Sequence, residues 1–335
     1  MKAFSINGKL DGALIELPDP IPNEDEVRIK VSFVGICGSD LHYYFEGANG
    51  AFVVKQPLIP GHELSGTVDL DPSGELAVGT RVTLHPATFG ESEKGIEDKR
   101  HLWPKGAYLG SASTSPHTQG AMSDYFIAKK SMIRVLPENL ELNIAALAEP
   151  MGVALHAINV GGGVKGKDIL VSGSGPIGLL VVAAAKILGA ASVTATDILS
   201  GALSRAAQVG ATTTLQIGAA ELPENSFDIV FECSAAPVAI SSAFQAVRRA
   251  GIVVQVGMLG AGPQPIAIAP LIAKEIQLRG TFRFNDEITD AVALLAQNPW
   301  IASVITHEFA AIDALEAFSV AKNSEISGKV LVRMN

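Results

Sequence analysis

A glycine-rich turn in the second half of the chain constrains its fold more than any other feature. Residues 169–178 read Ile-Leu-Val-Ser-Gly-Ser-Gly-Pro-Ile-Gly, so an apolar strand runs directly into the pattern Gly-x-Gly-x-x-Gly. A helix is predicted from this turn to about residue 188. The order of strand, turn and helix predicts the first unit of a dinucleotide-binding α/β domain.

The three glycines of this turn have distinct physical roles. Gly173 permits the tight turn, Gly175 lets a pyrophosphate approach the backbone, and Gly178 lets helix and strand pack closely. The N-terminus of the following helix attracts phosphate groups. The alternative is a glycine-rich turn that binds no nucleotide. The predicted cofactor-binding residues are Gly173, Gly175, Pro176, Ile177, Gly178 and Asp197.

Asp197 sets the expected cofactor preference. It ends the next predicted strand, 24 residues beyond Gly173. A carboxylate there would bind both ribose hydroxyls and repel a 2′-phosphate, which favours NAD over NADP. Arg205, about two helical turns later, either weakens this preference or is an exposed helix residue.

Alternation of strand and helix continues on both sides of the turn. Strands are predicted at 168–172, 192–197, 227–231, 252–256 and 276–284, and helices at 175–188, 200–208 and 238–247. This alternation predicts an α/β fold of the Rossmann type, a doubly wound parallel sheet with helices on both faces. Helices at 288–296 and 312–321 and strands at 303–309 and 329–333 are expected to close the chain.

The length of the chain predicts a second domain, because 335 residues exceed what one hydrophobic core usually organises. Strand-like segments at 27–34, 65–70 and 80–84, separated by Gly and Pro, predict an all-β lobe over the first 120 residues or so. A helix is predicted at 144–160, where three consecutive glycines end it. The domain boundary is expected within this helix.

Composition excludes several classes of protein. Hydrophobic residues make up 48% and charged residues 18%, which excludes disorder and predicts a homodimer or homotetramer that buries surface between subunits. The net charge of −9 argues against nucleic acid and anionic membranes as partners. Cys37 and Cys233 lie in different contexts and imply no disulfide framework. The longest apolar run, 177–185, ends at Lys186 before it could span a bilayer, so a cytoplasmic protein is expected.

A second group of residues indicates a metal site. Residues 35–42, Gly-Ile-Cys-Gly-Ser-Asp-Leu-His, place a thiol, a hydroxyl, a carboxylate and an imidazole after an apolar strand. His62 and Glu63 follow 25 and 26 residues after Cys37, and Glu149 adds a carboxylate far along the chain. Thiolate, imidazole and carboxylate together suit Zn²⁺, and a catalytic zinc leaves one position for water or substrate.

At these segments the sequence resembles the zinc-dependent medium-chain alcohol and polyol dehydrogenases, over nearly the whole chain. Residues 35–42 resemble the family's first-ligand loop, 61–66 its zinc signature, and 147–156 its third-ligand segment. Glu149 stands where many alcohol dehydrogenases carry cysteine, which points to the sorbitol and idonate dehydrogenase branch. The resemblance implies three segments: 1–152 as a GroES-like β-barrel catalytic domain, 153–285 as the NAD-binding domain, and 286–335 as a return to the catalytic domain.

The resemblance also implies roles for single residues. Cys37 and His62 would bind the zinc, and Glu63 and Glu149 compete for the third protein ligand, the other holding a water molecule. Asp40 would orient His62. Ser39 would contact the substrate oxygen, and His42 or Tyr43 would carry the proton outward unless His42 is simply an exposed histidine. Residues expected at the substrate are Tyr43, Tyr125, Arg283 and Phe284.

The charged segment 90–100 departs from the family pattern. Many relatives carry four closely spaced cysteines here that bind a second, structural zinc, whereas this chain has none. His85, Asp98 and His101 lack thiolates and close ligand spacing, so one zinc per chain is expected. The segment itself is predicted to be a solvated surface loop.

Two features favour a sugar acid of the L-idonate type as substrate. Residues 109–126 resemble idonate dehydrogenases more than sorbitol dehydrogenases. Arg283, at the end of the last predicted sheet strand, would pair with a carboxylate, or alternatively bind substrate hydroxyls or the cofactor. The expected reaction is oxidation of a secondary alcohol, with the proton leaving through Ser39 or water held by Glu149 and hydride passing to nicotinamide. The alternatives are a sorbitol or secondary-alcohol dehydrogenase, a zinc-free reductase, or a non-catalytic nucleotide-binding protein.

Overall fold

The computed structural model describes residues 1–334, which form two compact units. Unit 1 comprises Met1–Glu149, Ile288–Asn323 and the residues from Lys329 onward, and unit 2 comprises Pro150–Glu287 and Ser324–Gly328. The sequence predicted that the chain passes from one unit to the other after residues 152 and 285. In the structure it does so after residues 149 and 287, and residues 324–328 also belong to unit 2.

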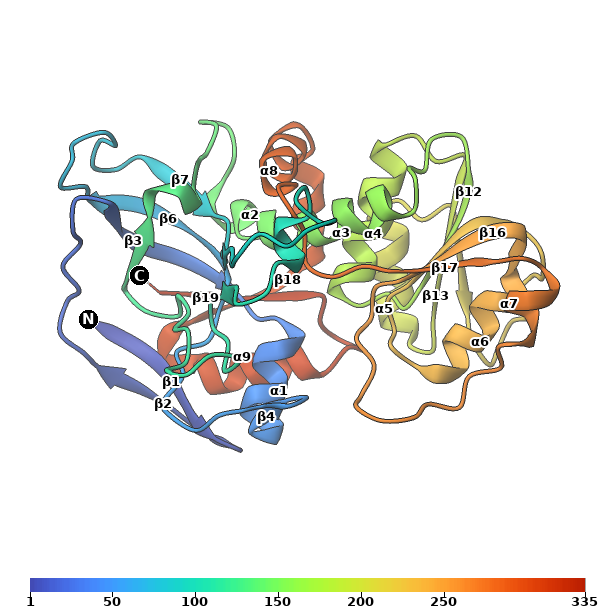
Figure 1. Ribbon diagram of the computed structural model, residues 1–335, viewed down its shortest axis with the longest axis horizontal. Helices are drawn as coiled ribbons and strands as arrows, with labels where there is room; N and C mark the ends of the chain where they lie inside the picture. The colour runs from blue at the N-terminus through green and yellow to red at the C-terminus, as the bar shows by residue number, and fades with distance from the viewer. Residues whose placement is uncertain (335) are drawn as a thin grey trace. The chain divides into compact units, whose positions relative to one another are not determined.

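Unit 1 is built on a seven-stranded sheet in the order β11-β7-β6-β3-β19-β18, with β10 also pairing with β3 (Figure 1). Only β18 and β19 run parallel; the other pairs are antiparallel. The alternating residues Val27, Ile29 and Val31 of β3 are fully buried, as their period-two pattern predicts. The strands are β3 (Glu26–Gly35), β6 (Glu63–Leu70), β7 (Arg81–Leu84), β10 (Tyr125–Lys129), β11 (Ile133–Val135), β18 (Ile305–Ala310) and β19 (Lys329–Arg333).

Shorter elements complete unit 1. The hairpins are β1 (Lys2–Gly8) with β2 (Asp11–Glu16), β4 (Ala48–Asn49) with β5 (Phe52–Val53), and β8 (Ala87–Thr88) with β9 (Ala107–Tyr108). Its helices are α1 (Gly38–Glu46), α2 (Leu142–Ala145), α8 (Ile288–Gln297) and α9 (Ala314–Lys322), with 3-10 turns at Arg100–Leu102, Lys130–Met132, Pro299–Val304 and Ala311–Asp313. The segment 91–100 is almost entirely exposed, which confirms the predicted surface loop.

The prediction of an all-β lobe is wrong because helix α1 begins directly after β3. Cys37 is the N-cap of this helix, and its amide donates a hydrogen bond to Asp40 Oδ2 at 2.9 Å. Gly47 ends the helix in the left-handed conformation, with φ at 76°. The polar stretch that the sequence suggested as a loop is therefore an N-cap and the first turn of a helix.

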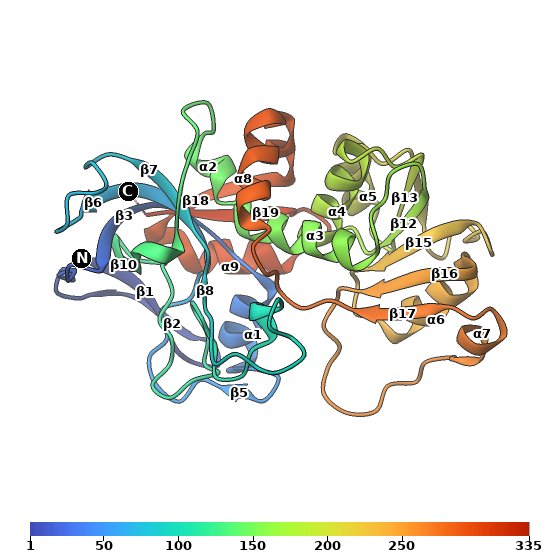
Figure 2. The ribbon, with the colours of Figure 1, turned by 45° about the horizontal axis from the view of Figure 1, so that its top comes forward.

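Unit 2 contains a six-stranded, fully parallel sheet in the order β14-β13-β12-β15-β16-β17, which confirms the Rossmann-type fold. Figure 2 shows β16 and β17 side by side near one edge of this sheet. The strands are β12 (Asp168–Ser172), β13 (Ser192–Asp197), β14 (Thr213–Gln216), β15 (Phe227–Glu232), β16 (Val247–Gln255) and β17 (Gln277–Gly280). The helices are α4 (Pro176–Ile187), α5 (Ser200–Gln208), α6 (Pro237–Ala246) and α7 (Ala269–Ala273), preceded by α3 (Ala148–Val160).

Two local predictions are wrong, and one strand was not predicted. The helix expected at 144–160 is broken into α2 and α3, because Pro150 lacks an amide proton and is tolerated only in the first turn of a helix. The strand expected at 276–284 ends at Gly280, since Arg283 adopts a positive φ of 52° that no strand allows. Strand β14 was not predicted, because its exposed threonines lack an apolar pattern. Among residues 1–334, no helix is long and apolar enough to cross a membrane.

Candidate metal centre and cofactor site

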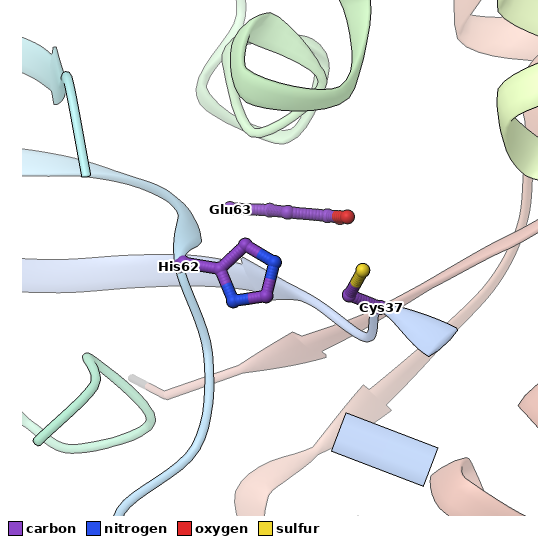
Figure 3. A group of neighbouring side chains, drawn as sticks. All are labelled: Cys37, His62 and Glu63. Atoms are coloured by element: carbon purple, nitrogen blue, oxygen red, sulfur yellow. The ribbon is translucent and has the colours of Figure 1, made fainter. Parts of the chain in front are cut away.

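Three side chains in unit 1 form a candidate metal centre. Ligand atoms of Cys37, His62 and Glu63 all lie within 4.8 Å of one another (Figure 3). The pairing of β3 with β6 places Gly35 opposite Glu63 and so brings the two parts of the chain together. A Cβ at Gly35 would lie 2.1 Å from Glu63 Oε2, so a larger residue there would displace the carboxylate.

The electrostatics of this centre favour a cation. Glu63 is fully buried and His62 is 6% exposed. Burial lowers the pKa of His62, but the neighbouring Cys37, Asp40 and Glu149 outweigh it and raise that pKa to about 10. An imidazole that so strongly prefers positive charge reports an excess of anionic groups around it, which a divalent metal ion would neutralise. The donor set of thiolate, imidazole and carboxylate fits zinc.

Glu63 already has one cationic partner. Lys329 Nζ, at the start of β19, donates hydrogen bonds to Glu63 Oε1 at 2.7 Å and Oε2 at 2.6 Å, and to the carbonyl of Ile36 at 3.1 Å. The Lys329 side chain is 2% exposed. Burial opposes its charge, but the attraction of Glu63 and Cys37 raises the pKa of Lys329. No sequence pattern points to Lys329, because a lone lysine in a closing strand carries no motif.

Glu149 lies in the first turn of α3 and is 5% exposed. It is not in the group of three whose ligand atoms lie within 4.8 Å. Its carboxylate accepts a hydrogen bond from the hydroxyl of Tyr108, and burial raises the pKa of Glu149. Tyr108 was also missed, since nothing in the sequence pattern distinguishes it from the other tyrosines of the chain.

Asp40 is fully buried beneath the site, and this burial raises its pKa. Its oxygens accept hydrogen bonds from the amides of Cys37, at 2.9 Å, and Gly61, at 3.2 Å. It therefore fixes the backbone beside two candidate ligands. His62 Nδ1 is buried and has no hydrogen-bond partner within the described chain, so an orienting bond from His62 to Asp40 stays a prediction.

The remaining residues predicted near the metal have varied surroundings. Ser39 is half-buried on α1, while His42 is exposed and its Nδ1 lies 2.9 Å from Glu46 Oε1. Tyr43 is 1% exposed, and its hydroxyl accepts a hydrogen bond from the amide of Ala112 at 3.1 Å. Tyr125 lies on β10, with the Arg28 guanidinium 5.0 Å from the centre of its ring. Their roles toward a substrate stay predictions.

Arg283 and Phe284 lie in unit 2, beyond the end of β17. Phe284 is 1% exposed and packs so closely on α3 that a Cβ at Gly152 would lie 3.2 Å from its ring. The Arg283 guanidinium lies 4.7 Å from the ring centre of Phe282. Its positive φ is a conformation that non-glycine residues adopt infrequently, often at functional sites.

The glycine-rich turn has the geometry that a dinucleotide needs. Gly173 has φ at 93°, and a Cβ at Gly178 would lie 1.9 Å from the Gly173 carbonyl oxygen. A Cβ at Gly175 would meet nothing within 4 Å, so this side of the turn is open to a ligand. Pro176 begins α4, and the N-terminus of a helix attracts phosphate groups. These features fit the pyrophosphate of NAD or NADP.

Asp197 ends β13 beside this turn. Its oxygens accept hydrogen bonds from the amides of Ser174, at 2.8 Å, and Leu199, at 3.0 Å, which orients the carboxylate and leaves lone pairs for ribose hydroxyls. Arg205 is not an exposed helix residue: it is 8% exposed and donates to the carbonyls of Ser324 and Glu325.

The fold and the donor set together define the class as a metal-dependent, dinucleotide-binding dehydrogenase. The family model described as "Alcohol dehydrogenase GroES-like domain" matches residues 23–138, and that described as "Zinc-binding dehydrogenase" matches residues 176–297. The chain belongs to the zinc-dependent alcohol and polyol dehydrogenases and is an oxidoreductase. Membership of this family implies the use of zinc and of NAD or NADP.

Individual relatives show which members of the family this chain resembles. L-Idonate 5-dehydrogenase (NAD(P)(+)) of Escherichia coli is 35% identical over 323 residues, which cover 92% of each chain. Human sorbitol dehydrogenase is 32% identical over 331 residues, 95% of this chain and 91% of the relative. The crystal structure of the E. coli L-idonate 5-dehydrogenase superposes with a TM-score of 0.93 at 32% identity, covering 99% of this chain and 98% of that one. The crystal structure of 2R,3R-butanediol dehydrogenase from Bacillus subtilis superposes with a TM-score of 0.89 at 27% identity, covering 100% of this chain and 99% of that one. The chain is therefore a dehydrogenase of the polyol and sugar-acid type.

Proposed function

We propose that this protein oxidises the secondary alcohol of a sugar acid, in the manner of an L-idonate 5-dehydrogenase, with one zinc ion per chain and NAD as the hydride acceptor. The observation that carries the proposal is the group of half-buried Cys37 with buried His62 and Glu63. A relative named for L-idonate, 35% identical over 92% of the chain, supports the choice of substrate.

The residues of unit 1 would hold the metal and move the proton. Zinc, when bound, supplies Lewis acidity that lowers the pKa of an alcohol, and the nicotinamide accepts hydride. Cys37, His62 and Glu63 would hold the ion. Ser39, half-buried at the start of α1, would accept the proton of the substrate hydroxyl, and exposed His42 would pass it to solvent.

Glu63 and Glu149 take different roles in this proposal. Glu63 supplies the third protein ligand, because its oxygen lies within 4.8 Å of the thiol and imidazole ligand atoms. Glu149, outside that group, would accept a hydrogen bond from a water molecule or from the substrate. Asp40 supports both Cys37 and the turn before His62 through its two backbone hydrogen bonds.

Metal analysis tests the zinc site directly. Purified protein is expected to carry one zinc per chain, and Cys37→Ser is expected to lose both zinc and turnover while keeping its fold, because β3 and β6 pair through their backbones and not through the ligand side chains. Two zinc ions per chain, or none after expression with ample zinc, would contradict the stoichiometry. Unfolding of Cys37→Ser at working temperature would instead mark the site as structural.

Arg283 is the residue proposed to recognise the substrate carboxylate, through a bidentate pair of hydrogen bonds. The test is kcat/KM for idonate and for its neutral polyol counterpart in the wild type, in Arg283→Ala and in Arg249→Ala, which removes an exposed arginine from β16. We expect Arg283→Ala alone to lose about 1.5–3 kcal/mol of transition-state binding, and only with the acid.

Sorbitol or another polyol is the second candidate substrate, favoured by the relatives named sorbitol dehydrogenase at 32–34% identity over most of the chain. Equal losses on acid and polyol in Arg283→Ala, or a wild-type preference for the polyol, would favour this candidate. The same panel measured with NAD and with NADP tests the cofactor preference that Asp197 predicts.

A homodimer or homotetramer is also proposed. Strand β17 is the last strand in the sheet order of unit 2, and Leu278 within it is 46% exposed. Ile272, on the short helix before it, is 76% exposed, so an apolar surface lies beside an open sheet edge. Light scattering of the purified protein measures the mass, and Leu278→Lys should lower it if this edge is the interface. A monomeric wild type would contradict the proposal.

A further inference from the structure

Tyr108 is fixed in place by the backbone around it. It ends the short strand β9 and pairs with Ala87 of β8. Two residues later Gly110, with φ at 63°, passes so close to Gly61 that a Cβ there would lie 2.8 Å from the Gly61 nitrogen. The Tyr108 segment therefore packs against the turn that directly precedes the candidate ligand His62.

The Tyr108 side chain contacts two residues of the metal centre. Its ring lies 5.4 Å from the His62 ring, centre to centre, at an interplanar angle of 65°. Its hydroxyl donates a hydrogen bond to Glu149 Oε1, and Tyr108 and Glu149 are 6% and 5% exposed. A buried phenol hydroxyl requires an acceptor, and a buried carboxylate requires a donor. Each group meets the requirement of the other.

We infer that Tyr108 is a positioning residue of the metal centre, which holds Glu149 through one carboxylate oxygen and leaves the other to accept a hydrogen bond from a water molecule or from the substrate. The inference rests on the proposed function and deepens it. A carboxylate held through Oε1 presents Oε2 in one orientation, whereas without that hydrogen bond the Glu149 side chain could rotate about its own bonds. Hydrogen bonds of this kind around metal ligands typically contribute 10–100-fold to metal affinity or activity.

The alternative is that Tyr108 only fills space against His62. Tyr108→Phe separates the two roles, because it keeps the ring and its contact with His62 and removes only the hydroxyl. Tyr44→Phe is the matched control, since Tyr44 lies in the same unit but packs against Phe45 and Phe318. Thermal unfolding of the metal-free forms checks that both variants fold.

The decisive readouts are the visible absorption spectrum of the cobalt-substituted protein, zinc affinity by chelator competition, and kcat on the best substrate of the polyol and sugar-acid panel. We expect Tyr108→Phe to alter the cobalt spectrum and to lower zinc affinity or kcat about 10–100-fold. Tyr44→Phe should match the wild type in all three. A spectrum, affinity and kcat unchanged in Tyr108→Phe, or a loss of its fold, would overturn the inference.

Dependence on Glu149 is tested in a double variant. If Tyr108 acts through Glu149, adding Tyr108→Phe to Glu149→Ala should change the spectrum and kcat by no more than about twofold. A full effect in that background would overturn the inference. A wild type that binds neither zinc nor cobalt would overturn the proposed function and the inference with it, whereas a metal-binding wild type with a silent Tyr108→Phe overturns the inference alone.

Discussion

Replacing Lys329 by methionine tests how much the buried ion pair with Glu63 stabilises the metal centre. The ammonium is 2% exposed and lies 2.6–2.7 Å from both oxygens of fully buried Glu63. Methionine keeps most of the length of lysine, so the substitution leaves Glu63 buried without its cation. Removing one partner of a buried ion pair costs about 3–5 kcal/mol. A domain of 150–250 residues unfolds about 2–4 °C lower per kcal/mol, so metal-free Lys329→Met should unfold about 6–20 °C below the wild type.

The same variant discriminates between the two carboxylates when zinc is added. If Glu63 binds the metal directly, zinc supplies the positive charge that Lys329 provided, and the loss of stability should shrink in the loaded protein. Thermal unfolding by circular dichroism, with and without a zinc chelator, measures both values, and exposed Lys129→Met is the control. A shift under about 2 °C in the metal-free form would refute the buried-charge argument. Equal shifts in both forms would instead point to Glu149 as the ligand.

Three further predictions concern unit 2. Gly175→Val should fold normally but bind NAD more weakly in calorimetry, because the added side chain would meet no protein atom within 4 Å of its Cβ but would obstruct a pyrophosphate. Gly178→Ala should instead destabilise the unit, since its Cβ would lie 1.9 Å from the Gly173 carbonyl oxygen. Asp197→Ala should weaken NAD and relatively favour NADP in competition binding; an unchanged ratio would refute contact with the ribose. Burial raises the pKa of Glu287, but its hydrogen bond with His156 and the charge of His156 lower that pKa to about 2. The stability that ionised Glu287 contributes is therefore present above about pH 4.5 and should be lost as the pH falls toward 2. Glu287→Gln should lack this loss when unfolding is measured in an acid titration.

Sequence patterns predicted the cofactor unit well, because its strands are buried on both faces and therefore read as apolar runs. The strands at 168–172 and 192–197 and the helix at 200–208 were placed to the residue. The errors at 144–160 and 276–284 share a physical cause. Pro150 and Arg283 alter the backbone at single positions, and a window of several residues averages such positions away.

The polar turn at Cys37 shows a different limit. Its residue types indicated a metal site, and the pairing of β3 with β6 brings Cys37 beside His62 and Glu63. The same residue types serve as N-cap and first turn of a helix, with Asp40 accepting the Cys37 amide. A polar stretch with two compatible uses reads as a loop until tertiary contacts choose the helix.

The two carboxylates of the site differ in character because they bind different donors, neither of which a sequence pattern singled out. Glu63 receives a full ammonium on both oxygens from Lys329, whereas Glu149 receives one neutral hydroxyl from Tyr108. An ammonium neutralises the charge of a carboxylate, while a phenol leaves that charge in place and fixes its direction. The charge of Glu149 is less compensated than that of Glu63, so a bound cation would change the environment of Glu149 more. Tyr108 and Lys329 together therefore influence how the centre responds to a metal ion.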